Sequence, residues 1–355
     1  MRSFRCGTCG QLIFFENSVC LRCSSPLGYE PGRRDLLTLV DGPDGSLLPA
    51  DGSVGGRWRR CANDATAGCN WLVAADEPPG ALCRSCRLTS VRPADDDTPA
   101  MAAFVTAEAA KRRLLDQLAR LGLPIVDRVA DPTDGLTFEL LSARNHSVTT
   151  GHLGGVVTLD LSESDDAYRE FVRQQLGEPY RTVLGHLRHE IGHYFWPHLV
   201  VAAGRLDEFR ARFGDERRDY QQALATHYEG GRPAGDDAWS GLHVSRYATV
   251  HPWEDWAETF AHYLHIRDGL ETADRFGVVI DEPARSFASG VGSPPIGEDT
   301  SVGPLVDRWL GLTVAMNAMS RSIGRDDLYP FVLSTDVVAK LDFVHRAVAA
   351  TAART

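Results

Sequence analysis

Apolar side chains recur every three to four residues along several stretches of the chain, a spacing that predicts helices with one buried face. The clearest stretch is 101–121, which Gly122 and Pro124 end. Further helices are predicted over 165–176, 179–196, 205–228, 253–267, 303–323 and 335–352. Short β-leaning runs predict a small mixed or mostly antiparallel sheet from 125–129, 136–141, 147–152 and 156–161. The pattern therefore predicts an α+β fold for the larger part of the chain.

Breaks in this pattern divide the chain. Residues 93–99 combine two prolines with an acidic run, the composition of a solvated linker. The expected parts are a first small module at 1–30, a second at 31–92, a linker at 93–100 and a large domain at 101–355. Two Gly/Pro-rich stretches, 230–241 and 286–303, predict long surface loops that would border a substrate cleft.

The composition of the 355 residues is that of an ordinary soluble protein, with 43% hydrophobic and 24% charged residues. No stretch approaches the roughly 20 apolar residues that span a bilayer, and the N-terminus lacks the apolar core of a secretory signal. We therefore expect a cytoplasmic protein without a membrane segment. The formal net charge is −11, yet residues 1–92 hold eleven arginines against nine acidic residues. The acidic excess thus lies in the large domain and disfavours nucleic acid as its partner.

All eight cysteines lie within the first 86 residues, in two groups of four. The first group is Cys6, Cys9, Cys20 and Cys23, and the second is Cys61, Cys69, Cys83 and Cys86. The first group consists of two CxxC pairs, each of which can present two thiolates to one tetrahedral zinc ion. In the second group, Cys61 and Cys69 are separated by seven residues, whereas Cys83 and Cys86 form a CxxC pair. We therefore expect two zinc ribbons before the large domain.

Metal is favoured over the alternative, a disulfide framework, because CxxC pairs occur here in a chain without an export signal. The same cysteine pattern is also compatible with iron as the bound metal. Four thiolates close the coordination sphere, so both sites would be structural, and metal binding would supply most of the folding free energy of such small modules. Each closed site carries a formal charge of −2, which offsets the nearby arginines. We therefore expect the ribbons to dock a protein partner or act as a scaffold rather than bind nucleic acid.

The segment His189-Glu190-Ile191-Gly192-His193 carries the chemistry of the large domain. On a helix it places two imidazoles one turn apart on one face, with Glu190 beside them. This arrangement suits a zinc ion with an open coordination position, where the carboxylate takes a proton from a zinc-activated water that attacks a peptide carbonyl. A five-residue pattern can also arise by chance, so a third ligand is needed.

The third ligand is expected to be acidic. A nearby histidine ligand would require Gly and His where the chain has Trp196 and Leu199. A later predicted helix instead carries Glu254 and Glu258 on one face. Glu254 can ligate zinc, and Glu258 can accept the free ring N–H of a zinc-bound histidine. The neighbouring Asp255 stays open as an alternative ligand.

The runs HLRHEIGHYFWPHL and SRYATVHPWEDWAETFAHYLH, together with the cysteine-rich start, resemble bacterial zinc-binding metallopeptidases that carry an N-terminal zinc ribbon. The resemblance covers nearly the whole chain and implies a zincin-like peptidase domain. More distantly, the spacing of Tyr247, Glu254 and Glu258 is similar to that in the lethal-factor group of gluzincins. This similarity implies that Glu254 ligates zinc, Glu258 orients a ligand and Tyr247 stabilises an oxyanion.

Other residues near the motifs have structural explanations. Tyr247 can equally be a packed or exposed tyrosine. Four nearby histidines are expected to be supporting or surface residues rather than ligands: His186, His198, His251 and His262. Four aromatic residues are expected to pack the two metal-binding helices together: Trp196, Trp253, Trp256 and Phe260. The run 154–159 is either a strand at the edge of the cleft that pairs with substrate or an ordinary internal strand.

The sequence thus predicts a cytoplasmic zincin-like peptidase behind two zinc ribbons, with two structural zinc ions, one catalytic zinc ion and a peptide or protein substrate. One alternative is an inactive zincin relic whose ribbons bind protein or nucleic acid, although the intact Glu190 argues against it. A second alternative is a metal hydrolase that acts on an amide other than a peptide, because the zinc chemistry would be the same.

Overall fold

The structure is a computed structural model that describes residues 2–52, 55–143, 147–176, 181–229, 238–280 and 301–352. By packing, the chain forms two compact units. The first contains residues 1–119 and 125–169, and the second contains residues 120–124 and 170–355. None of the helices in the described ranges is long and apolar enough to cross a membrane.

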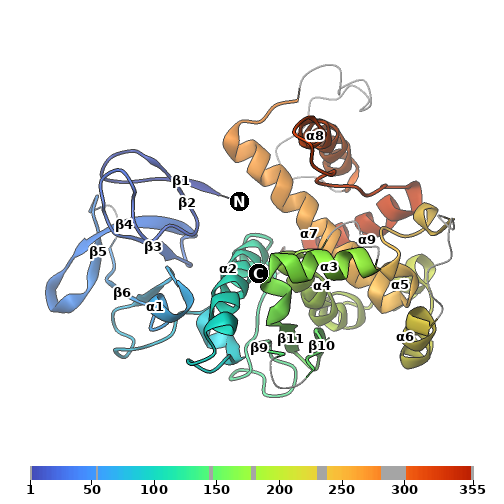
Figure 1. Cartoon of the computed structure of the whole chain (residues 1–355), viewed down its shortest axis with the longest axis horizontal. Coiled ribbons are helices and arrows are strands. Elements are labelled where there is room, and N and C mark those ends of the chain that lie inside the picture. The colour runs from blue at the N-terminus through green and yellow to red at the C-terminus, as the bar shows by residue number, and fades with distance from the viewer. Residues whose placement is uncertain are drawn as a thin grey trace. The chain divides into compact units, whose positions relative to one another are not determined.

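The first unit begins with the cysteine-rich modules (Figure 1). β1 (Ser3–Arg5) and β2 (Leu12–Phe14) form an antiparallel hairpin. An antiparallel five-stranded sheet follows, in the order β3 (Leu27–Glu30), β4 (Asp35–Asp41), β5 (Leu47–Pro49), β6 (Trp58–Arg60) and β7 (Leu72–Ala74), with α1 (Asp64–Ala67) between the last two. β4, β6 and β7 share a core of Leu37, Leu39, Trp58 and Leu72. Because β3 and β4 form a hairpin of the same sheet, the predicted boundary at residue 30 falls inside that sheet.

The second sheet of this unit is mixed. Its strand order is β10 (Gly151–Leu153), β11 (Val156–Asp160), β9 (Thr137–Leu141) and β8 (Thr89–Val91). β9 is parallel to both of its neighbours, whereas β10 and β11 are antiparallel. The strand predicted at 125–129 is wrong, since only Asp127 forms a bridge there. The Asp127 carboxylate accepts the backbone N–H groups of Val129 and Ala130, and this turns the chain out of an extended path.

The run 154–159 supplies an internal strand rather than an edge strand. β11 pairs with β9 on one side and with β10 on the other, so β10 lies at the edge of the sheet. Gly154 and Gly155 both have positive φ, 50° and 78°, which lets two residues close the hairpin between β10 and β11. Of the two alternatives for this run, the structure therefore shows the internal strand, because both edges of β11 are paired.

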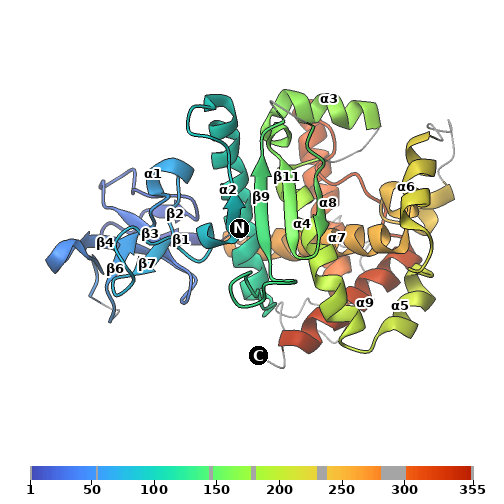
Figure 2. The same cartoon turned by 90° about the horizontal axis from the view of Figure 1, so that it is seen from below.

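The long helix α2 (Thr98–Arg120) confirms the helix predicted over 101–121 and begins three residues earlier. Its Asp116 carboxylate accepts a hydrogen bond from the Tyr29 hydroxyl of β3. The Lys111 ammonium lies 5.4 Å from the centre of the Phe138 ring of β9. Figure 2 shows α2 running alongside β9. The first helix and the sheet of the predicted large domain therefore pack with the ribbons.

The second unit is helical. It contains most of α3 (Asp166–Leu176), then α4 (Val183–Trp196), α5 (Leu206–Phe213), α6 (Tyr220–Glu229), α7 (Pro252–Phe276), α8 (Gly303–Ser322) and α9 (Thr335–Ala352). The single helix predicted over 205–228 is wrong, because Gly214 at φ 100° ends α5. α7 extends beyond the predicted 267, since Leu270 and Ala273 continue its buried face. Of the predicted loops, residues 230–237 and 281–300 lie outside the described residues.

The predicted helix 179–196, which carries the HExxH segment His189–His193, ends just before Pro197. The α-helix does end at Trp196, because proline has no N–H to donate, but the chain continues through one wide π turn, Pro197–Val201. The backbone N–H of Ala202 closes this turn by donating to the Pro197 carbonyl over 2.8 Å. Leu199 and Val200 of this turn are buried. The helical segment is therefore longer than predicted.

Close packing of α4 against α7 is the feature of this unit that positions the predicted site. A Cβ added to Gly192 of α4 would lie 3.0 Å from the Cα of Ala257 in α7. The Trp256 indole N–H donates to the Gly192 carbonyl over 2.8 Å. The Trp196 and Trp253 ring centres are 5.6 Å apart. These contacts confirm that aromatic side chains pack the two helices together.

We predict that Gly192→Ala destabilises the protein although alanine favours helix. The new methyl group meets backbone of α7, which cannot move without displacing the whole helix, and such overpacking costs about 1–3 kcal/mol. Urea unfolding of the zinc-loaded protein measures the change. Gly311→Ala is the matched control, because nothing lies within 4 Å of a Cβ at this α8 position. It should be neutral or stabilise by up to about 1 kcal/mol, and equal stabilisation by both variants would contradict this account of the helix contact.

Candidate metal sites

Local sequence fixes where each metal-binding helix begins. The Thr182 side chain caps α4 by accepting the Gly185 N–H over 3.0 Å. His251 caps α7, where its Nδ1 accepts the Trp253 N–H over 3.2 Å and Pro252 takes the first helical position. Glu254 consequently lies in the first turn of α7, close to the contact with α4.

Three predicted ligands converge between these helices. The Nε2 atoms of His189 and His193 are 3.2 Å apart. The Glu254 Oε2 atom lies 3.0 Å from the first nitrogen and 3.4 Å from the second. A tetrahedral zinc ion with bonds of about 2.0–2.1 Å holds its ligand atoms roughly 3.3 Å apart. The donor types and their spacing therefore fit a zinc ion.

The structure brings Glu254, rather than Asp255, to the histidines. The Asp255 side chain points to α9, where its Oδ2 accepts a hydrogen bond from the Lys340 ammonium over 2.6 Å. Lys340 also donates to the Leu242 carbonyl over 2.7 Å. Burial raises the pKa of Asp255 to about 7, against the opposing effect of Lys340. Asp255 is thus the buried ion-pair partner of Lys340, and it does not belong to the group formed by the two histidines and Glu254.

Glu258 lies one turn after Glu254 and orients His189. Its Oε1 lies 2.7 Å from the His189 Nδ1, so the imidazole donates there and turns its Nε2 toward the site. Burial opposes the charged form of Glu258, but the hydrogen bond with His189 lowers the pKa of Glu258 to about 2. The Ser245 hydroxyl donates to the second oxygen of Glu258 over 2.5 Å. Sequence reasoning missed Ser245, which lies 13 residues before its partner.

Tyr220 is a second residue that sequence reasoning missed. Its hydroxyl donates to the Glu254 Oε1 over 2.6 Å, which leaves Oε2 facing the two histidines. Tyr220 begins α6, whereas Glu254 lies on α7, 34 residues later. No spacing rule links positions on separate helices, so nothing in the sequence singled out this tyrosine.

Glu190 and Tyr247 both lie at this site. Glu190 is only 6% exposed, and burial raises its pKa while the neighbouring His189 and His193 oppose that shift. Tyr247 belongs to a short 3-10 turn, Tyr247–Thr249, that precedes α7. Its ring centre lies 5.8 Å from that of His189. The predicted base and the predicted oxyanion residue are therefore neighbours of the first imidazole.

The other histidines near the motifs have different partners. The His251 Nε2 lies 3.1 Å from the Arg218 carbonyl, in addition to its capping contact. The His262 Nδ1 lies 2.8 Å from the Tyr329 hydroxyl, and burial lowers the pKa of His262 to about 4. The His198 ring packs on Tyr194, with ring centres 5.2 Å apart. Within the described residues, neither these histidines nor His186 joins a group that can hold a metal ion.

Each cysteine group converges on one point. In the first group, the Sγ atoms of Cys6 and Cys23 are 3.6 Å apart and those of Cys9 and Cys20 are 3.7 Å apart. In the second group, the Sγ atoms of Cys69 and Cys83 are 3.6 Å apart. Zinc–sulfur bonds of about 2.3 Å place tetrahedral ligands roughly 3.8 Å apart. Both groups therefore fit a four-thiolate metal ion, and all eight cysteines are free of disulfides.

A buried arginine of α2 supports a charged second cluster. Arg112 is 4% exposed, and its Nη2 donates to the carbonyls of Ala67 and Gly68, just before Cys69. Its Nη1 is also buried but has no hydrogen-bond partner, and its nearest carboxylate is that of Glu108 at 3.8 Å. Burying an unused cationic donor is costly unless a negative group lies nearby. Glu108 also pairs with Lys111, so one carboxylate faces two buried cations, and a cluster of four thiolates around one zinc ion, with a formal charge of −2, would supply the further negative charge.

The fold and the convergent ligands define a zinc-binding α+β protein with an N-terminal ribbon, and comparison with known proteins gives the family. The family described as "Putative zinc-binding metallo-peptidase" matches residues 100–347, and a zinc-ribbon domain matches residues 3–97. The chain belongs to this metallopeptidase family. The two matches meet at the segment expected from composition to be a linker.

The relatives extend over nearly the whole chain. Uncharacterized proteins of Mycobacterium bovis and of two strains of Mycobacterium tuberculosis are each 48% identical over 349 residues, which cover 98% of this chain and 95% of theirs. No solved structure gives a significant match. The family supports zinc binding, as the cysteine groups do, but the names of the relatives state no substrate.

We predict that Tyr220→Phe weakens metal binding by the His189/His193/Glu254 group about 10- to 100-fold, because losing a group that orients a ligand usually has an effect of this size. Competition for zinc with a chelator of known affinity measures the change. Tyr168→Phe, at a 40% exposed position of α3, is the control and should bind as wild type. Equal affinities in all three proteins would show that Tyr220 does not position the ligand.

We predict that Arg112→Leu makes one zinc ion leave the ribbon region faster, by roughly tenfold, because the cluster loses its buried cation. Release into a chromogenic chelator gives the rate. Arg113→Leu removes the next charge along α2, which is half-exposed and pairs with Glu16, and it should release zinc at the wild-type rate. Unchanged release from Arg112→Leu would mean that its guanidinium does not support the cluster.

Proposed function

We propose that this protein is a zinc-dependent peptidase with one catalytic zinc ion and two structural ones. The observation that carries the proposal is the convergence of His189, His193 and Glu254 within hydrogen-bonding range of one another, with Glu190 on the same helix. Three protein ligands leave a fourth position for water or substrate, which is the arrangement of catalytic rather than structural zinc.

Zinc held there would lower the pKa of water and polarise a substrate carbonyl. Glu190 would act as the general base, because it follows the first ligand on the same helix and burial raises its pKa, which strengthens it as a proton acceptor. Glu258 and Ser245 hold the His189 ring in one orientation, and Tyr220 holds Glu254. These contacts preorganise the site before substrate arrives.

Tyr247 would stabilise negative charge that develops on the substrate oxygen. Its position beside the His189 ring, on a turn that leads directly into α7, supports this role. A phenol is a suitable donor, since such groups act by hydrogen bonding to the oxyanion of acyl transfer. The alternative in which Tyr247 only packs against the imidazoles predicts no specific loss of rate when its hydroxyl is removed.

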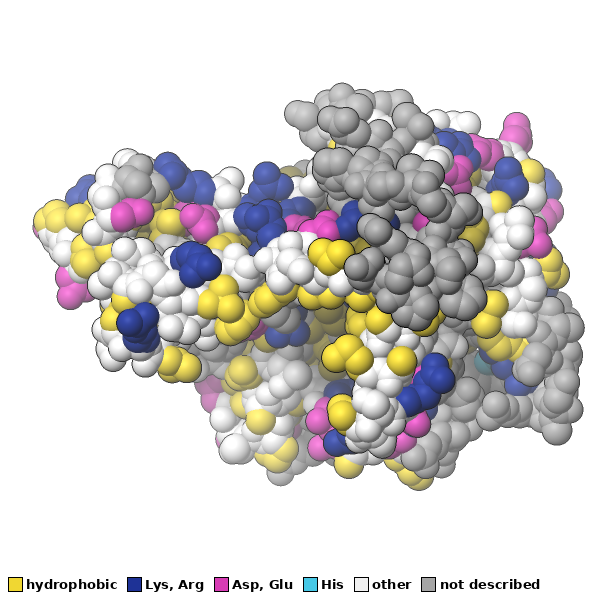
Figure 3. All heavy atoms as spheres, turned by 90° about the horizontal axis from the view of Figure 1, so that it is seen from above, with side chains coloured by type: hydrophobic (Ala, Val, Ile, Leu, Met, Phe, Trp, Pro, Cys, Tyr) yellow, Lys and Arg dark blue, Asp and Glu magenta, His cyan; other side chains and the backbone are white. Residues whose placement is uncertain are grey.

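The ribbons would serve as structural modules or as a dock for a protein partner. On the face shown in Figure 3, basic and acidic side chains of the described residues are interspersed and form no single large basic patch. This distribution favours a protein partner over nucleic acid. Eight free cysteines fit a reducing compartment, which supports our proposal that the protein works in the cytoplasm.

The decisive variant for this function is Glu190→Gln. It removes the base but keeps the shape of the side chain, so cleavage of peptides should fall at least about 100-fold while zinc content and thermal stability stay as in wild type. The rate is measured by mass spectrometry on a peptide library. Glu170→Gln is the control, because this exposed α3 residue pairs with Arg173 at the surface.

Two outcomes separate the competing functions. Equal cleavage by wild type and Glu190→Gln would remove Glu190 as the base. Absence of cleavage by the zinc-loaded wild-type protein would favour an inactive relic or a hydrolase of other amides, and a panel of non-peptide amides then distinguishes these two. The intact His189, Glu190 and His193 set favours the active peptidase.

A further inference from the structure

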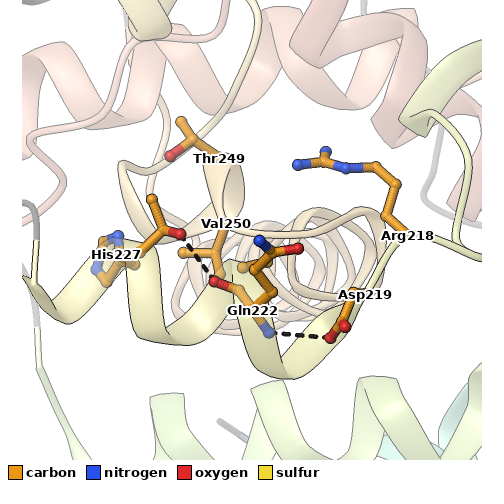
Figure 4. A pocket seen from close by; sticks show the side chains of 8 residues that line it. Arg218, Asp219, Gln222, His227, Thr249 and Val250 are labelled. Atoms are coloured by element: carbon orange, nitrogen blue, oxygen red, sulfur yellow. Dashed lines mark hydrogen bonds between the residues drawn. The ribbon is translucent and has the colours of Figure 1, made fainter.

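One face of α6 lines a pocket of about 470 Å3 that no residue of the proposed reaction occupies (Figure 4). Gln222 and His227 contribute from α6, while Arg218 and Asp219 lie at the start of the helix. The opposite wall is Thr249 and Val250, from the end of the 3-10 turn that holds Tyr247.

The pocket lies directly beside the proposed catalytic site. At the start of α6, Tyr220 donates to the ligand carboxylate of Glu254. At its other end, the His227 ring lies 5.7 Å from the Tyr247 ring, which itself lies beside His189. Substrate held at the metal centre would therefore have part of its chain next to this pocket.

The positive charge at the pocket has no acidic partner among the residues that the structure describes. Arg218 extends over the pocket with its guanidinium toward Thr249 (Figure 4), and among the described residues it has no ion-pair partner. The preceding arginine differs, since Arg217 forms a bidentate pair with Asp215. A second cation, Arg246, lies close enough to His227 to lower its pKa together with burial, and Arg246 also lacks an ion-pair partner within the described ranges.

The one carboxylate in the pocket is already engaged. The Asp219 Oδ1 accepts the Gln222 N–H over 3.0 Å and so caps the first turn of α6. Among the lining residues, Arg218 is therefore the guanidinium left to pair with a ligand, while the whole chain has a formal net charge of −11. An unpaired guanidinium in a pocket attracts anionic groups locally, even on a protein whose net charge is negative.

We propose that this pocket is a subsite for an acidic side chain of the substrate, with Arg218 as the residue that determines the specificity. The inference rests on the proposed peptidase function and adds a substrate class to it: peptides with Asp or Glu close to the scissile bond. Arginine is suited to this task, because its planar guanidinium can donate two parallel hydrogen bonds to one carboxylate. The apolar surfaces of Val250 and Ala223 would contact the methylene groups of the same side chain.

The experiment maps cleavage sites of the zinc-loaded full chain in a peptide library by mass spectrometry. Wild type should show Asp and Glu enriched at one fixed position near the cleaved bond. Arg218→Glu should lose that enrichment and cleave a matched peptide with Glu at that position about tenfold more slowly, with less effect on its Lys counterpart. Arg217→Glu is the matched control, because it changes the net charge equally from the neighbouring position without lining the pocket. Enrichment that is absent from wild type, or equally present in all three proteins, would overturn the proposal.

A binding measurement keeps the inference separate from the peptidase function. The zinc-loaded Glu190→Gln protein is titrated with fluorescent alanine-rich peptides that carry one Glu, Gln or Lys. The Glu peptide should bind about tenfold more tightly than the Gln peptide, and adding Arg218→Glu should reverse the order. If the wild-type protein cleaves no peptide and this binding preference is still observed, the subsite is supported and the peptidase function is refuted. If binding shows no charge preference, the subsite is refuted whether or not peptides are cleaved.

Discussion

Backbone contact between α4 and α7 at Gly192 and Ala257 is the constraint on which the proposed site depends. His189 and His193 lie on one helix and Glu254 on the other, so the distance between the helices sets the distance between the ligands. A Cβ at position 192 would lie only 3.0 Å from the Ala257 Cα, so glycine permits this close packing, and the indole N–H of Trp256 stabilises it by donating to the Gly192 carbonyl. Glycine in a helix interior lowers helix stability by about 1 kcal/mol relative to alanine. Glycine is nevertheless suited to this position, because it lets the two helices pack closely enough for the three ligands to meet.

The parts of the site that follow from local geometry were predictable from the sequence. Residues four apart share a helix face, which was enough to pair His189 with His193 and Glu254 with Glu258. The choice between Glu254 and Asp255 was not local, because it depends on Lys340, which lies 85 residues beyond Asp255 on α9. The role of Tyr220 could not be predicted for the same reason, since its contact with Glu254 joins separate helices.

The fold was predictable to a similar extent. Helix periodicity identified α2, α3, α8 and α9 with ends close to those observed. Errors arose where one residue overrides the pattern: Asp127 turns the chain where a strand was expected, and Gly214 splits one helix into two. Strand order could not be predicted, because β9 pairs with β8, which precedes it in sequence by the whole length of α2. Packing of α2 with the ribbons could not be predicted either, since it depends on contacts between residues far apart in sequence, such as Tyr29 and Asp116.

Metal ions thus have two different roles in this protein. The ribbon clusters belong to the core of the first unit, where buried charges of α2 compensate them, whereas the histidine and glutamate group leaves a coordination position for chemistry. The central claim is that His189, His193 and Glu254 form that open zinc site. A crystal structure of the zinc-loaded protein, with anomalous scattering measured at the zinc edge, tests it most directly. The account predicts an anomalous peak about 2.0–2.2 Å from the Nε2 atoms of both histidines and from the Glu254 carboxylate. Peaks at the cysteine groups alone, or a zinc ion bound by Asp255, would contradict it.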